Sequence, residues 1–215
     1  MEVIVGIEDI RKPLNNPVLT IGNFDGVHRG HQALFQRVKD WAARIQGRSV
    51  VMTFNPHPLE VFRPGNGPAF ITTHERKLEL IAEAGIEVAI VVPFDETFAR
   101  IPADRFVKDI LVNRIGIRAI VVGHDYRFGR GREGDIEFLR KMAERYAFDV
   151  EAVSGIDVDG ILVSSTLIRQ CIQGGDLREA ARLLGRPYEI KGKVVQGRNR
   201  GARPVSYTHL SLSTI

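Results

Sequence analysis

The sequence predicts an α/β fold in which a parallel sheet carries helices on both faces. Short apolar runs rich in β-branched residues recur along the chain, and amphipathic helical patterns fill the intervals between them. Strands that alternate with helices in this way form βαβ units, which build parallel sheets. Four of the apolar runs are almost continuously hydrophobic, as is typical of strands that are covered on both sides.

The expected strands are 18–22, 49–54, 86–92, 117–123 and 148–153. The expected helices lie between them, near 31–46, 74–84, 103–115 and 135–146. In open parallel sheets with helices on both faces, ligands bind beyond the carboxyl ends of the strands. The residues that follow each strand are therefore the first candidates for a functional site.

Composition indicates an ordinary globular protein of 215 residues, 44% hydrophobic and 26% charged. The start of the chain lacks the features of a signal peptide, and no apolar run is long enough to span a membrane. The single cysteine, Cys171, excludes an internal disulfide and fits a reducing cytoplasm. The net charge of +4 permits nucleic acid as a partner but equally suits small anionic substrates such as nucleotides.

The segment after the first core strand, GNFDGVHRGH, carries the strongest functional signal. Its glycines allow tight turns and a close approach of the backbone to a ligand; they are Gly22, Gly26 and Gly30. The next helix is expected to begin near Arg29, and both His28 and His31 can point from that end toward one spot. Free N–H groups, a positive dipole end and two imidazole donors together predict a site for an oxyanion, above all a phosphate.

Two other interpretations of the paired histidines exist. One is a loop histidine beside a histidine in the capping region, with no ligand. The other is a zinc site built from His28, His31 and Asp25, although no second cluster of metal-binding residues in the sequence supports it.

A second phosphate-directed feature lies in VSSTLIRQCI, where Ser164, Ser165 and Thr166 precede an apolar helical run. One hydroxyl is expected to cap the helix, which leaves two unexplained. Arg169 lies four residues after Ser165 on the same helix face, so its guanidinium could fork onto a phosphate held there. The alternative is that the hydroxyls only cap the helix, that Arg169 is solvent-exposed, and that no ligand binds there.

Two further strand ends carry side chains that suit a planar, phosphorylated ligand. TFNPHP (53–58) follows the second core strand, and its prolines stiffen a loop that presents Phe54 and His57. GHDYRFGRGREGD (123–135) follows the fourth, where Tyr126 and Phe128 could stack on a ring and Arg127 could meet a phosphate. The G-x-G-x-x-G pattern in this loop does not follow its strand directly, so it is not interpreted as a dinucleotide fingerprint.

GNFDGVHRGH, TFNPHP, GHDYRFGRGREGD and VSSTLIR, in this order, resemble the bacterial bifunctional riboflavin kinase/FAD synthetase family. The resemblance covers about residues 4–203. It implies that residues 1–186 form an FMN adenylyltransferase domain with a Rossmann-like nucleotidyltransferase fold. The implied reaction joins the adenylyl group of ATP to FMN, giving FAD and pyrophosphate, with Mg²⁺.

The resemblance also implies roles for single residues. His28 and His31 would form the catalytic H-x-G-H signature that contacts the ATP phosphates. The residues implied to bind ATP are Gly22, Asn23, Phe24, Gly30, Ser164, Ser165, Thr166 and Arg169. Those implied to bind FMN are Phe54, His57, Pro58, Asp125, Tyr126, Arg127 and Phe128. No residue is implied as a metal ligand, because Mg²⁺ is expected to be held largely through substrate phosphates.

After residue 186 the pattern changes. Residues 187–203 resemble the first strand of the family's riboflavin kinase module, so they are interpreted as the start of a truncated kinase domain. Residues 204–215 contain no Asp, Glu, Lys or Arg and depart from the family's pattern, so they are interpreted as a non-native or disordered tail. Too few residues follow 186 to close a second domain with its own core, which puts riboflavin kinase activity in doubt.

Two other classes of function stay open. One is a related nucleotidyltransferase that acts on another phosphorylated acceptor. The other is a non-catalytic nucleotide- or RNA-binding module, suggested by the basic charge. The arginines at 127, 130 and 132 cluster in one loop rather than along a helix, which favours a compact anionic ligand. The expected partners are therefore ATP and FMN, without nucleic acid or a membrane, in the cytoplasm; the oligomeric state is left open.

Overall fold

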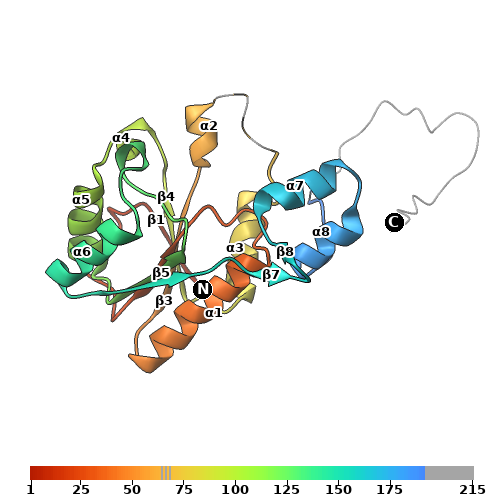
Figure 1. Ribbon diagram of the computed structural model, residues 1–215. Coiled ribbons are helices and arrows are strands. Elements are labelled where there is room, and N and C mark those ends of the chain that lie inside the picture. The colour runs from red at the N-terminus through yellow and green to blue at the C-terminus, as the bar shows by residue number, and fades with distance from the viewer. Residues whose placement is uncertain (64, 66, 68, 192–215) are drawn as a thin grey trace, which may run out of the picture.

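The protein is built on a six-stranded sheet with the strand order β1-β4-β3-β2-β5-β6. The computed structural model describes residues 1–63, 65, 67 and 69–191 (Figure 1). The strands are β1 (Glu2–Val5), β2 (Val18–Ile21), β3 (Ser49–Phe54), β4 (Val88–Val92), β5 (Ala119–Gly123) and β6 (Asp149–Val153). All neighbouring strands pair in parallel, which confirms the predicted fold class.

The helices follow the strands in alternation, as the sequence pattern predicts. They are α1 (Arg29–Arg44), α2 (Pro58–Phe62), α3 (His74–Glu83), α4 (Glu96–Ala99), α5 (Ala103–Arg105), the π-helix η1 (Phe106–Ile115), the 3₁₀ turn η2 (Arg130–Arg132), α6 (Ile136–Tyr146), α7 (Ser165–Gln173) and α8 (Leu177–Leu184). A small antiparallel hairpin, β7 (Asp157–Val158) and β8 (Ile161–Leu162), leads into α7. The expected strands and helices are present with small shifts at their ends, and the helix expected at 103–115 is divided into α5 and η1. The elements that were not expected are β1, α2, α4, η2, the hairpin and α8.

Helices cover both faces of the sheet (Figure 1). Successive residues of a strand point to opposite faces. In β3, Val51 therefore packs in a cluster with α1 and α3, while Met52 packs on the other face with η1 and α6. A third, smaller cluster holds α7 and α8 together beside the sheet. The described part of the chain contains no helix with both the length and the apolar character needed to cross a bilayer.

The strand order reverses next to β2. From β2 the chain continues through β3 and β4 on one side, then crosses to β5 and β6 on the other. Loops that leave neighbouring strands at such a point diverge and open a crevice for ligands. The histidine-containing loop follows β2 and therefore stands at this switch point.

The last part of the chain runs past α8 without further helix or strand up to residue 191. The truncated kinase segment expected at 187–203 falls largely outside the described residues, and the tail expected at 204–215 falls wholly outside them.

Candidate functional site

The loop between β2 and α1 has a strained backbone that its surroundings hold in place. Phe24 and Val27 have φ angles of 52° and 39°, which are uncommon without glycine and most unfavourable for a β-branched residue. Arg186 donates hydrogen bonds to the carbonyls of Gly26 and Val27, at 2.7 and 3.2 Å, and Gln32 donates to Val27 at 2.9 Å. Strain of this kind persists where contacts over-determine the backbone, and it gathers at binding sites.

The glycine at the start of this loop is needed for space. A Cβ on Gly22 would lie 2.9 Å from the ring of Phe24, closer than van der Waals contact allows. Phe24 is itself buried and packs edge-on against the ring of His31, with centroids 5.1 Å apart. The loop thus turns tightly and supports one of the paired histidines, while Asn23 lines the adjoining pocket.

His28 and His31 lie together at the start of α1, as their spacing predicts. Their rings stack with centroids 3.5 Å apart and planes inclined by 19°. His28 caps the helix: its Nδ1 accepts a hydrogen bond from the backbone N–H of His31 at 3.4 Å. A Cβ on Gly30 would crowd the His28 ring at 3.1 Å. Because Nδ1 of His28 accepts, the neutral ring carries its proton on Nε2 and can donate from there.

Both histidines are neutral at pH 7. Burial lowers the pKa of His28 to about 4 and outweighs the attraction of Asp25, which acts in the opposite direction. Burial, followed by the proximity of His28, lowers the pKa of His31 well below its ordinary value. The Nδ1 of His31 is buried and has no hydrogen-bond partner among the described residues. An unpaired buried polar atom is destabilising, and such atoms in native proteins often mark a functional position.

Asp25 joins the two phosphate-directed motifs, a role that the sequence analysis did not assign to it. Its buried carboxylate accepts hydrogen bonds from the backbone N–H groups of Ile71 and Thr72, both at 3.1 Å. It also accepts from Nη2 of Arg169 at 2.7 Å, forming an ion pair with little exposure. The hydroxyl of Ser165 donates to the backbone carbonyl of Asp25 at 3.0 Å. The structure therefore brings α7 against the histidine-containing loop.

The other residues of the α7 motif have different surroundings: one caps the helix, one is exposed to solvent, and Arg169 is bonded to protein acceptors. Ser164 is the N-cap, and its hydroxyl accepts from the N–H of Leu167 at 3.2 Å. Thr166 is exposed. Arg169 also donates through Nε to the carbonyl of Ala69 at 3.0 Å. The guanidinium that was expected to fork onto a phosphate is thus bonded to protein acceptors here.

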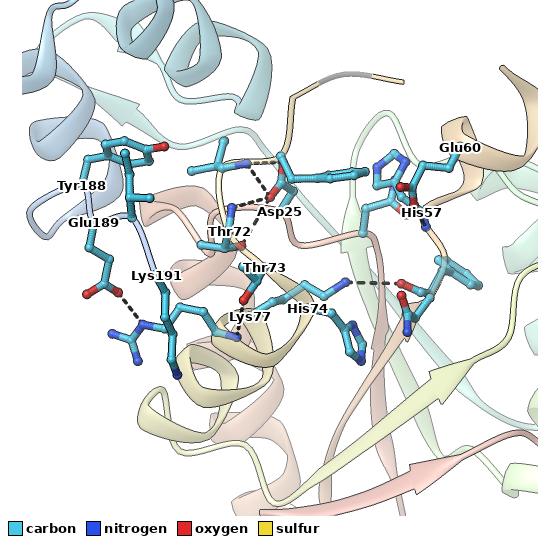
Figure 2. A pocket seen from close by; sticks show the side chains of 17 residues that line it. Asp25, His57, Glu60, Thr72, Thr73, His74, Lys77, Tyr188, Glu189 and Lys191 are labelled. Carbon is cyan, nitrogen blue, oxygen red and sulfur yellow. Dashed lines mark hydrogen bonds and ion pairs between the residues drawn. The ribbon is translucent and has the colours of Figure 1, made fainter. Parts of the chain in front are cut away.

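A pocket of about 360 Å³ opens beside this cluster (Figure 2). Asn23 and Asp25 line it from the loop after β2, and Phe54 at the end of β3 and His57 in the following loop line it from the next strand. Glu60 of α2, residues 70–73, the start of α3 and residues 188–191 complete the lining. The pocket lies where the sequence analysis places a ligand, at the carboxyl ends of neighbouring parallel strands.

The TFNPHP segment forms a rigid wall of the pocket. His57 caps α2 through Nδ1, which accepts from the N–H of Leu59 at 3.1 Å, and its own N–H donates to Glu60 at 2.9 Å. Pro58 is the first residue of α2. Phe54 is half-buried and packs against Phe94, with ring centroids 5.4 Å apart. Phe54 and His57 therefore face the pocket together, as expected.

The structure does not place the predicted residues of the loop after β5 in the lining of this pocket. Phe128 is buried in the core, and the half-buried ring of Tyr126 stacks on it with centroids 5.5 Å apart. Asp125 is exposed. Arg127 is also exposed and forms an ion pair with Asp135 at 3.1 Å. Phe128 is connected to Phe54 through the rings of Phe106 and Phe98 in the same core cluster.

Lys77 is a pocket residue that the sequence analysis missed. It lies in the first turn of α3 and is only 8% exposed. Its ammonium donates to the hydroxyl of Thr53 at 3.1 Å. It also donates to the carbonyl of Phe54 at 3.3 Å (Figure 2). The Thr53 hydroxyl donates in turn to the carbonyl of Asn23 at 3.2 Å. Burial lowers the pKa of Lys77 to about 8.

The described residues contain no group of three or more His, Cys, Asp or Glu side chains placed to hold a metal ion. The carboxylate of Asp25, which the zinc interpretation requires, is bonded to Arg169 and to backbone N–H groups. The side chains around His28 and His31 therefore give no support to a zinc site.

Comparisons with known proteins assign the chain to one family. The model of the FAD synthetase family matches residues 10–167. The bifunctional riboflavin kinase/FMN adenylyltransferase of Escherichia coli K12 is 41% identical over 202 residues, covering 94% of this chain and 64% of that protein. The protein of the same name from Buchnera aphidicola (subsp. Schizaphis graminum) is 35% identical, covering 99% of this chain and 68% of its own length. This chain thus spans about two thirds of the length of these relatives.

Two solved structures extend the comparison. A crystal structure of a macrolide-efflux protein from Streptococcus pneumoniae aligns with a TM-score of 0.80 at 31% identity, covering 93% of this chain and 67% of that one. A pantoate-beta-alanine ligase from Francisella tularensis, complexed with beta-gamma ATP and beta-alanine, aligns with a TM-score of 0.51 at 11% identity, which shows a shared fold alone. The family match and the sequence identity over nearly the whole chain show that this chain belongs to the FAD synthetase family.

Proposed function

We propose that this chain transfers the adenylyl group of ATP to FMN, forming FAD and pyrophosphate. One observation carries the proposal beyond family membership: Asp25 ties the α7 motif to the loop of the paired histidines, at the edge of the pocket. This arrangement gathers imidazole, hydroxyl and guanidinium donors around one place, as the binding of a polyphosphate requires.

The reaction needs positioning more than it needs a base. The phosphate of FMN is mostly ionised at pH 7, since the second pKa of a phosphate monoester is about 6. One of its oxygens attacks the α-phosphorus of ATP, the bond from that phosphorus to the bridging oxygen breaks, and pyrophosphate leaves with the electron pair. The protein must hold two anions together and stabilise the charge that develops on the α-phosphate and on pyrophosphate.

The paired histidines suit this task as neutral donors. His28 can donate from Nε2 toward a phosphate oxygen at the start of α1, where free N–H groups and the helix dipole add to the attraction. Because the buried ring of His28 stacks on the half-buried ring of His31, these donors need little reorganisation during the reaction, which makes them more effective than water. Arg169 and Ser165 hold the loop in this arrangement, and we propose that Arg169, Ser164 and Thr166 also face the ATP phosphates.

We propose that the pocket lined by Phe54 and His57 receives FMN. The aromatic side chains of this wall offer a surface for a planar ring. Asp125, Tyr126, Arg127 and Phe128 enter the proposal through the family resemblance alone. Mg²⁺ enters as part of the substrate MgATP, since it binds phosphate oxygens readily and needs few protein ligands. Both substrates are available in the cytoplasm, which is the location we propose.

The test is the formation of FAD by the purified chain supplied with FMN and MgATP, measured by chromatography. Phosphopantetheine with MgATP and phosphocholine with MgCTP serve as alternative acceptor and donor pairs, because a related nucleotidyltransferase would adenylylate the first or cytidylylate the second instead. Conversion of one of these acceptors without FAD would overturn the proposal. Binding of ATP with no transfer to any acceptor would favour a non-catalytic nucleotide-binding module.

A further inference from the structure

Lys77 holds a buried positive charge that no protein anion compensates directly. Its ammonium can donate three hydrogen bonds, and two of them go to Thr53 and Phe54. Among the residues that the structure describes, no acceptor takes the third and no carboxylate forms a salt bridge with Lys77. Asp25 and Glu60 attract it from a distance, but Asp25 is paired with Arg169 and Glu60 caps α2.

The position of this charge is unfavourable in two further ways. A cation in the first turn of a helix opposes the helix dipole, which favours anions there. Moving a charge out of water into the protein without giving it a partner of opposite charge also costs free energy. The other cations around the pocket are neutralised: Arg76 pairs with Glu83 at 2.7 Å, and Lys191 pairs with Glu79 at 2.7 Å. Lys77 therefore differs from its neighbours in facing the pocket with its charge unpaired (Figure 2).

The surroundings of Lys77 place it on the acceptor side of the site. Its two hydrogen-bond partners, Thr53 and Phe54, are the last residues of β3 and precede the loop of His57. The lining of this pocket does not include His28 or His31. The ammonium is also joined, through Thr53, to the carbonyl of Asn23 in the loop after β2. It thus stands between the wall proposed for FMN and the loop proposed for ATP.

We propose that Lys77 binds the phosphate group of FMN and holds it for attack on ATP. This inference rests on the proposed function. The phosphate of FMN would supply the missing anion and accept the third N–H of the ammonium, while Thr53 and Phe54 keep the nitrogen in place. The competing interpretation is structural: Lys77 only ties α3 to β3 through its two hydrogen bonds.

The test compares ligands with and without the phosphate. Dissociation constants of FMN, riboflavin and ATP are measured by calorimetry for the full wild-type chain, for Lys77→Met and for Lys141→Met, a control at an exposed lysine on α6. Wild type and control should bind FMN more tightly than riboflavin. Lys77→Met should weaken FMN binding about 10- to 100-fold, as expected for the loss of a charged hydrogen bond, and leave riboflavin and ATP within about twofold.

Several results would overturn the assignment. Equal weakening of FMN and riboflavin would show a collapsed pocket or a ring contact, and selective weakening of ATP would place Lys77 with the other substrate. Should Lys77→Met fail to fold, Lys77→Gln keeps two donors without the charge, and it should show the same selective loss of FMN affinity. A chain that forms no FAD but prefers FMN over riboflavin through Lys77 would refute the proposed function and, with it, the role of Lys77 in the attack, while the binding of the FMN phosphate by Lys77 would stand. Equal affinity of the wild type for both flavins would refute the inference whatever its turnover.

Discussion

Acidification should destabilise this protein through His28. Its pKa lies near 4 in the folded chain, against an ordinary value of 6.5, chiefly because the ring is buried. Between these values the unfolded chain binds a proton that the folded chain excludes, so the free energy of unfolding rises with pH there. The stability supplied by the neutral ring is complete above pH 6.5 and is lost as the pH falls toward 4. At 1.36 kcal/mol for each pH unit, this loss amounts to about 3 kcal/mol by pH 4.

The assay is urea unfolding followed by circular dichroism at pH 7 and pH 4.5. His28→Asn is the matched variant, because asparagine is also a good N-cap but does not titrate. Other groups, including His31, add to the acid sensitivity of both proteins, so the difference between the two proteins isolates His28. The wild type should lose about 2.5 kcal/mol more than the variant between these pH values. An equal loss in both proteins would refute the assignment of a neutral, buried His28.

Four further substitutions test the site. His28→Ala and His31→Ala should each lower kcat for FAD formation about 100- to 1000-fold, as for the loss of a transition-state donor, and near-wild-type turnover in a folded variant would remove that residue from the mechanism. Arg169→Met leaves the carboxylate of Asp25 buried without its partner, so urea unfolding should show a loss of about 3–5 kcal/mol, whereas a neutral effect would mean that the pair is not maintained in solution. The wild type should gain about 2 kcal/mol of stability relative to Lys77→Met between pH 7.5 and 9.5. The reason is that the pKa of Lys77 is lowered to about 8, so the folded chain loses its buried charge over that range. Parallel pH profiles of the two proteins would contradict this.

The elements that were predicted correctly are those with a local signature. Continuous apolar runs such as 49–54 and 117–123 indicate parallel strands that are buried on both faces. Apolar residues that recur three and four positions apart indicate the helices. The start of α1 at the paired histidines is local as well, and so is the capping of α7 by one of three consecutive hydroxyls, which the structure assigns to Ser164. β1 was missed because it is a short, mostly exposed strand at the sheet edge, defined by its pairing with β4.

The contacts within the site depend on tertiary packing between segments that are distant in sequence. Asp25 meets Arg169 across 144 positions of sequence, and only the packing of α7 beside the loop after β2 decides that pair. Phe128 lies in a loop with a polar sequence, yet it enters the core because neighbouring elements leave an apolar space for it. Lys77 counts as polar in any helical pattern, and it points inward because the end of β3 supplies two acceptors there. Periodicity reports which face of an element is apolar, whereas the partner of a buried polar group is set by elements distant in sequence that meet only once the chain has folded.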